Sequence, residues 1–151
     1  MSAVPASGTP MYDTILVTLD TTSTDRAIID HVKRLARAVS TRRVVLLHVA
    51  DGWAARTYGA EAISPEITED RAYLDGVRAE FEGAGIAAEV ALAFGEPAVE
   101  IVSWVEREGC DLIAMSTHGH RFVADLFLGT TAIRVQHRVN VPVLLLRATP
   151  S

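Results

Sequence analysis

The chain of 151 residues contains a single cysteine, Cys110, so no disulfide can form within it. That scarcity is typical of a reducing compartment, and we expect a cytoplasmic protein. No apolar run approaches the roughly 18 residues that a membrane-spanning helix needs, so we expect no membrane partner. Positive charge is scarce too: the formal net charge is −5, which argues against nucleic acid as the main partner.

The first ten residues also lack the basic start and apolar core of a signal peptide. They are small, polar and Pro/Gly-containing, and we expect residues 1–10 to form a disordered tail. The rest, 11–148, has the composition of one globular domain, since the sequence is 49% hydrophobic and 22% charged. It is long enough to bury a full hydrophobic core.

Apolar runs alternate with segments of helical spacing along the chain. A capping box of Thr22 and Asp25 is expected to open the first helix. Pro97 and Gly109 are expected to bound the third helix. The expected strands are 14–19, 43–49, 86–94, 111–115 and 141–146, and the expected later helices are 66–83, 98–108 and 130–138.

Continuous apolar strands joined by helices predict an α/β fold, a three-layer sandwich with a five-stranded parallel sheet. Such Rossmann-like sheets bind ligands outside the carboxyl ends of their strands, where the strand order reverses. The segments expected at those ends are Asp20, Val49 to Asp51, Phe94 to Glu96 and Met115 to His120.

A loop rich in small residues, from Ser116 to Thr131, separates the fourth strand from the last helix. Backbone N–H groups and the positive end of a helix dipole favour anions, and glycine lets the anion approach closely. The sequence therefore predicts a phosphate cradle at Gly129, Thr130 and Thr131.

Several polar residues near the strand ends can either bind a ligand or have a structural role. Asp20 either accepts a hydrogen bond from a base or sugar or holds a metal on phosphates, or it forms a turn or helix cap. His118 and His120 can complement phosphate charge, but no third ligand is nearby, and we expect no metal site. His48 is expected to be a core histidine with its own partner, and Arg134 either reaches the ligand or faces solvent.

Six short segments carry a family resemblance: MYDTILVTLD at 11–20, LLHV at 46–49, FGEP at 94–97, DLIAM at 111–115, GT at 129–130 and VPVL at 141–144. On these segments the chain resembles a single-domain universal stress protein, of the adenine nucleotide α-hydrolase-like fold, over about residues 11–147. The resemblance implies the strand order 3-2-1-4-5.

The nucleotide-binding branch of that family carries the pattern G-x2-G-x9-G-[ST]. Here the corresponding line is Ser116-x2-Gly119-x9-Gly129-Thr130, with serine in place of the first glycine. The resemblance implies ATP or AMP as ligand, with Mg2+ on the phosphates. Serine costs little if its φ is negative, and is strained if φ is positive.

The resemblance also implies where the ligand lies. Asp20 and Val49 would contact the adenine and ribose end, and Met115 and Ser116 would pass the ribose and the first phosphate. The expected cofactor-binding residues, with the two loop histidines included, are Thr18, Leu19, Asp20, Val49, Met115, Ser116, His118, Gly119, His120, Gly129, Thr130 and Thr131.

These residues favour an adenine-nucleotide-binding regulatory module of the stress response with little or no hydrolysis, because no convincing general base stands at the phosphate loop. A slow ATPase that uses His118 or His120 is one alternative. A ligand-free dimeric interaction protein is the other.

The last expected strand, 141–146, is apolar on both faces and falls at a sheet edge in that strand order. An exposed apolar edge invites pairing with another chain. We therefore expect a homodimer in which Val141, Val143 and Leu145 pair along a two-fold axis.

Overall fold

The computed structural model describes residues 9–50, 65–118 and 130–148. Strands and helices alternate through these ranges, as the sequence patterns predict. The strands are β1 (Thr14–Thr18), β2 (Arg43–Ala50), β3 (Ala87–Phe94), β4 (Leu112–His118) and β5 (Val143–Ala148). The helices are α1 (Asp25–Ala38), α3 (Pro65–Gly83), α4 (Pro97–Glu108) and α5 (Thr130–Gln136).

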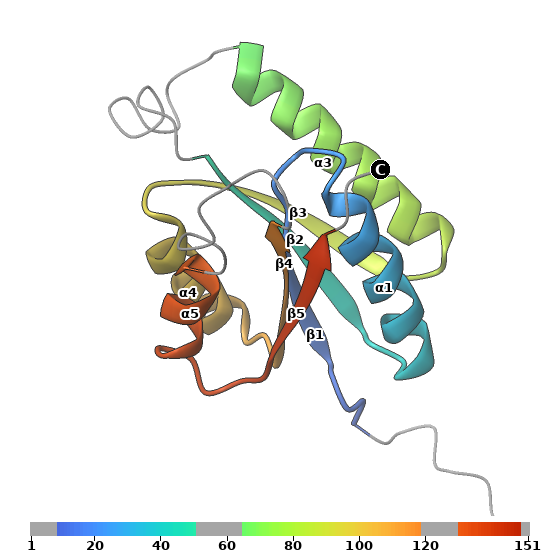
Figure 1. Ribbon diagram of the computed structural model, residues 1–151. Coiled ribbons are helices and arrows are strands. Elements are labelled where there is room, and N and C mark those ends of the chain that lie inside the picture. Colours follow the sequence, from blue (N-terminus) through green and yellow to red (C-terminus); the bar gives the residue numbers. More distant parts are fainter. Residues whose placement is uncertain (1–8, 51–64, 119–129, 149–151) are drawn as a thin grey trace, which may run out of the picture.

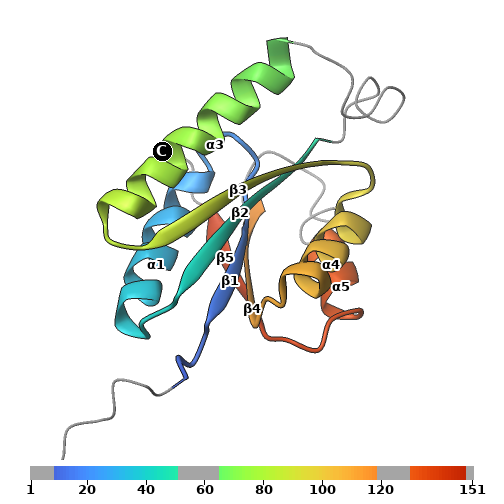
Figure 2. The same cartoon turned by 180° about the vertical axis from the view of Figure 1, so that it is seen from behind.

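The five strands form one parallel sheet in the order β3-β2-β1-β4-β5. Helices α1 and α3 cover one face of this sheet, and α4 and α5 cover the other (Figures 1 and 2). The predicted three-layer α/β sandwich and its strand order are confirmed.

The core consists of two apolar clusters, one on each face of the sheet. Ile15 and Val17 of β1 pack toward α1 and α3, where Phe81 is fully buried. Leu16 and Ile113 point the opposite way and pack with residues of α4 and α5. This alternation follows from the two-residue period of a strand, and it makes both faces of β1 and β4 apolar.

The ends of α4 form as predicted. Glu96 is the N-cap residue, and its side chain accepts hydrogen bonds from the backbone N–H groups of Ala98 and Val99. Pro97 takes the first helical position, where its missing N–H costs nothing. Gly109 ends the helix with φ 64°, a left-handed conformation that favours glycine.

The predicted capping box at the start of α1 is wrong. The helix begins at Asp25, and the N-cap residue Thr24 makes no side-chain capping bond. A turn over residues 20–24 intervenes, and the Asp25 carboxylate reaches back to the N–H groups of Asp20 and Thr21. Asp25 therefore stabilises the turn that precedes the helix and does not take part in a capping box.

The predicted last strand is displaced by two residues, from 141–146 to Val143–Ala148. Proline at 142 has no N–H to donate, so the ladder with β4 begins after it. The strand extends through Arg147 because β4 itself runs to His118. In the described parts of the chain, no helix is both long and apolar enough to cross a membrane.

Candidate functional site

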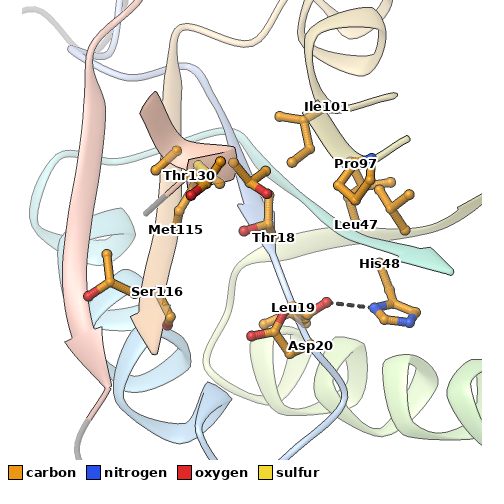
Figure 3. A pocket seen from close by; sticks show the side chains of 14 residues that line it. Thr18, Leu19, Asp20, Leu47, His48, Pro97, Ile101, Met115, Ser116 and Thr130 are labelled. Atoms are coloured by element: carbon orange, nitrogen blue, oxygen red, sulfur yellow. Dashed lines mark hydrogen bonds between the residues drawn. The ribbon is translucent and has the colours of Figure 1, made fainter. Parts of the chain in front are cut away.

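A cleft opens at the carboxyl ends of β1, β2 and β4, between these strands and the first turns of α4 and α5 (Figure 3). The described residues that line it are Thr18, Leu19, Asp20, Leu47, His48, Val49, Pro97, Ile101, Met115, Ser116, Thr117, Thr130, Thr131 and Ala132.

The strand order explains why the cleft lies there. From β1 the chain builds the sheet outward through β2 and β3, then returns to add β4 and β5 on the other side of β1. The connections leaving β1 and β4 diverge to opposite faces of the sheet: α1 follows β1 and α5 follows β4 (Figure 1). A crevice at such a reversal point is the usual ligand site of open α/β sheets.

Most of the residues predicted to bind the ligand lie together in this cleft. Those that line it are Thr18, Leu19, Asp20, Val49, Met115, Ser116, Thr130 and Thr131. His118 is the last residue of β4. Gly119, His120 and Gly129 lie outside the described residues, so their predicted roles stay predictions.

Ser116 occupies a regular strand position in β4, opposite Leu146 of β5. Among the described residues other than glycine, positive φ occurs at Thr21 and Ser40, so Ser116 takes the unstrained alternative. Its hydroxyl oxygen is buried and has no hydrogen-bond partner in the part of the chain that the structure describes. Ser116 lies two residues after Ala114, and both Ala114 and Leu146 belong to the α1/α3 cluster, so the Ser116 hydroxyl is buried on that face of the sheet rather than exposed in the cleft.

His48 has the partners expected of a core histidine, but it also lines the cleft. Its Nδ1 lies 2.7 Å from the carbonyl oxygen of Leu19, to which it donates (Figure 3). Its Nε2 lies 3.4 Å from Oδ2 of Asp70 on α3. Both ring nitrogens therefore face oxygen acceptors, which fixes the ring beside Asp20.

The turn that carries Asp20 is held by a buried carboxylate. Asp25 accepts hydrogen bonds from the N–H groups of Asp20 (2.9 Å) and Thr21 (2.8 Å) and from the hydroxyl of Tyr73 (2.9 Å). Burial raises the pKa of Asp25 above its ordinary value, against the lowering effect of these bonds. Burial and the neighbouring Asp25 likewise raise the pKa of Tyr73.

Arg134 is paired at the side of the cleft. Its guanidinium Nη1 lies 2.7 Å from Oε1 of Glu96, the residue that caps α4. Both side chains are substantially exposed, so the pair adds little stability. It does connect α5 to α4, the two helices that flank the cleft.

Sequence reasoning missed the apolar side of the cleft: Leu47, Pro97, Ile101 and Ala132. Leu47 could have been found, because it lies two residues before Val49 and so on the same face of β2. Ile101 and Ala132 come from different helices, and only the packing of α4 and α5 brings them together.

The cleft combines an apolar wall with hydroxyl groups and the carboxylate of Asp20. This suits a small ligand that has a flat apolar ring and several polar substituents. The described residues contain no group of three His, Cys, Asp or Glu side chains that could hold a metal ion. A divalent cation there would need further oxygens from the ligand.

Comparison with known proteins gives consistent matches. Residues 11–147 match the model of the universal stress protein family. Universal stress protein MJ0577 of Methanocaldococcus jannaschii is 28% identical over 156 residues, which cover 91% of this chain and 96% of that protein. A solved structure of MJ0577 has 29% sequence identity and a TM-score of 0.76, with 93% of this chain and 99% of that chain covered.

Two more distant solved structures contain nucleotides. A universal stress protein in complex with cAMP is 18% identical with a TM-score of 0.68, covering 91% of this chain and 98% of its own. One from Archaeoglobus fulgidus, in complex with dAMP, is 20% identical with a TM-score of 0.66, covering 89% and 98%. At these identities the likeness shows the shared fold.

Proposed function

This chain belongs to the universal stress protein family, and from that premise we propose that its cleft binds an adenine nucleotide, ATP or AMP. In this proposal the protein is a regulatory module of the stress response with little or no hydrolysis. The observation that carries it is the convergence of predicted binding residues from β1, β2, β4 and α5 on one cleft at the strand-order reversal.

The composition of the cleft supports an orientation for the nucleotide. Val49 and Asp20 lie at the carboxyl ends of β2 and β1, where an apolar contact and a carboxylate suit the adenine and ribose. Met115 and Ser116 line the cleft near the carboxyl end of β4, which suits the ribose or the first phosphate. The hydroxyls of Thr130 and Thr131 lie where the remaining phosphates would follow.

Related structures lend further support. The family includes members solved with cAMP and with dAMP, both of which carry adenine and a phosphate. Ser116, the departure from the glycine pattern, has an ordinary strand conformation, so it does not strain the site.

Mg2+ fits the cleft only as a companion of the phosphates. The described residues offer no metal cage, and Asp20 is the carboxylate among the described residues of the cleft. Magnesium commonly binds through one or two carboxylates plus phosphate oxygens. When bound it would neutralise phosphate charge, while Asp20 and the threonine hydroxyls would orient the nucleotide.

The first test identifies the ligand and one residue that holds it. Nucleotide released by denaturing freshly purified protein is identified by mass spectrometry, and Kd values for ATP and AMP are then measured by calorimetry. We expect bound adenine nucleotide in the wild type. Asp20→Asn should raise Kd about tenfold, equivalent to about 1.4 kcal/mol.

Asp75→Asn is the matched control, because Asp75 is an exposed aspartate on α3 that pairs with Arg78. Its Kd should equal that of the wild type. An empty protein with no affinity for either nucleotide would favour the ligand-free interaction protein. Phosphate release from ATP that falls when Asp20, His118 or His120 is replaced by alanine would favour the slow ATPase.

A further inference from the structure

Three consecutive residues, Leu19 to Thr21, leave β1 and bring Asp20 into the cleft. Side chains form hydrogen bonds with three backbone groups of this segment, one carbonyl and two N–H groups. The carbonyl of Leu19 accepts a hydrogen bond from His48 (2.7 Å), as Figure 3 shows. The N–H groups of Asp20 and Thr21 donate to Asp25 at 2.9 and 2.8 Å. The position of Asp20 therefore depends on these two side chains.

Both of these side chains are in turn bound by α3. Asp70 Oδ2 lies 3.4 Å from Nε2 of His48, and the Tyr73 hydroxyl donates to Oδ2 of Asp25 at 2.9 Å. Asp70 and Tyr73 are three residues apart, which places them on the same face of the helix. One face of α3 thus reaches both sides of the turn.

The arrangement carries two costs to folding. Thr21 has φ 60°, which is an outlier for a β-branched residue. Asp25 is fully buried, and among the described residues it forms no ion pair with lysine or arginine. A buried charge held mainly by hydrogen bonds destabilises the folded state. Strain and buried charge of this kind concentrate where a functional geometry must be fixed.

We propose that Asp70 and Tyr73 of α3, acting through His48 and Asp25, are positioning residues that hold the Asp20 turn in its nucleotide-binding form. This inference rests on the proposed function, because it assigns these residues a role in that site. Asp25, Asp70 and Tyr73 are absent from the residues that line the cleft, so they act on the ligand through the turn. Helix α3 then positions the Asp20 turn in addition to covering the sheet.

A purely structural role for the same contacts makes a different prediction. It would lower stability in the variants without changing the affinity of the folded protein. A positioning role changes the affinity of the folded protein and the environment of the Asp20 and Thr21 amides. Two readouts, ATP affinity and backbone NMR, therefore separate the roles.

The test uses Asp25→Asn and Tyr73→Phe in the full chain. Asparagine keeps the size of the side chain but offers one oxygen where three donors need acceptors. We expect Kd for ATP to rise about tenfold in Asp25→Asn and about threefold in Tyr73→Phe. We also expect the Asp20 and Thr21 amide protons of the ligand-free variants to move upfield as their charge-assisted bonds weaken.

The controls are Asp30→Asn, an exposed aspartate on α1, and Tyr12→Phe, a tyrosine packed against the α1/α3 cluster. Both should bind ATP as the wild type does. If Asp25→Asn does not fold, Tyr73→Phe decides, because it removes a single hydroxyl.

The failures are distinguishable. Wild-type ATP affinity in a folded Tyr73→Phe or Asp25→Asn variant would overturn this inference and leave the proposed function standing. A wild-type protein that binds no adenine nucleotide would overturn the proposed function and this inference with it. Rapid hydrogen exchange of the Asp20 and Thr21 amides in the wild type would show that Asp25 does not hold the turn, and this result alone would overturn the inference.

Discussion

Ser116 stands where the nucleotide-binding branch of the family has the first glycine of its pattern, and its surroundings explain why a side chain fits. The residue lies in β4 with ordinary strand geometry, so a Cβ causes no conformational strain. Its hydroxyl is nevertheless buried and unpaired within the described chain. A buried polar group without a partner costs free energy.

The corresponding prediction is that Ser116→Ala stabilises the ligand-free protein by about 1 kcal/mol, because an unsatisfied buried hydroxyl is removed. Because the hydroxyl is buried on the α1/α3 face, the same variant should gain as much stability from added ATP as the wild type gains. Urea unfolding with and without ATP measures both effects. A loss of more than about 1 kcal/mol without ligand would mean that the hydroxyl has a partner in the folded chain.

Asp25 gives a prediction about pH. Burial raises its pKa above the ordinary 3.8, so the folded state holds this proton more tightly than the unfolded state does. Its stabilising contribution is complete below pH 3.8 and is lost as pH rises through the raised pKa. The free energy of unfolding of the wild type, minus that of Asp25→Asn, should therefore fall as pH rises above that value.

Urea unfolding at a series of pH values from roughly 4 to 8 checks this difference. Asp75→Asn, at an exposed site on α3, is measured over the same series as the reference variant. A difference that rises with pH would mean that the hydrogen bonds from Asp20, Thr21 and Tyr73 outweigh burial.

At the scale of single helices, replacing two glycines by alanine should have opposite effects on stability. Gly109 ends α4 with φ 64°, whereas Gly76 lies inside α3 with open space where a Cβ would be. We predict that Gly109→Ala destabilises the protein by about 1 kcal/mol, and that Gly76→Ala stabilises it by about 0.5–1 kcal/mol. Thermal unfolding of both variants tests the contrast, and equal signs would contradict it.

The accuracy of the sequence predictions also differs from element to element. The bounds of α4 were predictable because Pro97 and Gly109 determine them through backbone conformation alone. The start of α1 was not predictable, because the Thr22 and Asp25 pattern permits a local cap, while burial under Tyr73 turns Asp25 toward Asp20 and Thr21. A local pattern cannot reveal a partner 48 residues away.

At the scale of the whole molecule, β5 remains at the edge of the described sheet, with β4 as its neighbour. Leu144 and Leu146 pack toward α1, and Leu145 is 44% exposed on the opposite face. An apolar edge strand favours antiparallel pairing with a second copy. The homodimer through Val143 and Leu145, with Val141 just before the strand, stays a prediction.

That prediction is tested by Leu145→Lys, which places a charge on the edge strand and should convert a dimer into a monomer. Ile133→Lys is the control, because Ile133 is 53% exposed but belongs to helix α5 and not to the edge strand. Light scattering at micromolar concentration gives the mass of each variant. A wild type that is already monomeric would contradict the prediction.

The sequence by itself determined the fold, because apolar strands alternating with amphipathic helices have few solutions, and family motifs reduced these to one strand order. It also identified the cleft residues near the carboxyl ends of two strands: Thr18 to Asp20 at the end of β1, and Met115 and Ser116 in β4. Only the tertiary structure decided the wall formed by Ile101 and Ala132 and the link from Tyr73 through Asp25 to the Asp20 turn. Those contacts join residues far apart in the chain, and their geometry depends on how helices pack across the sheet.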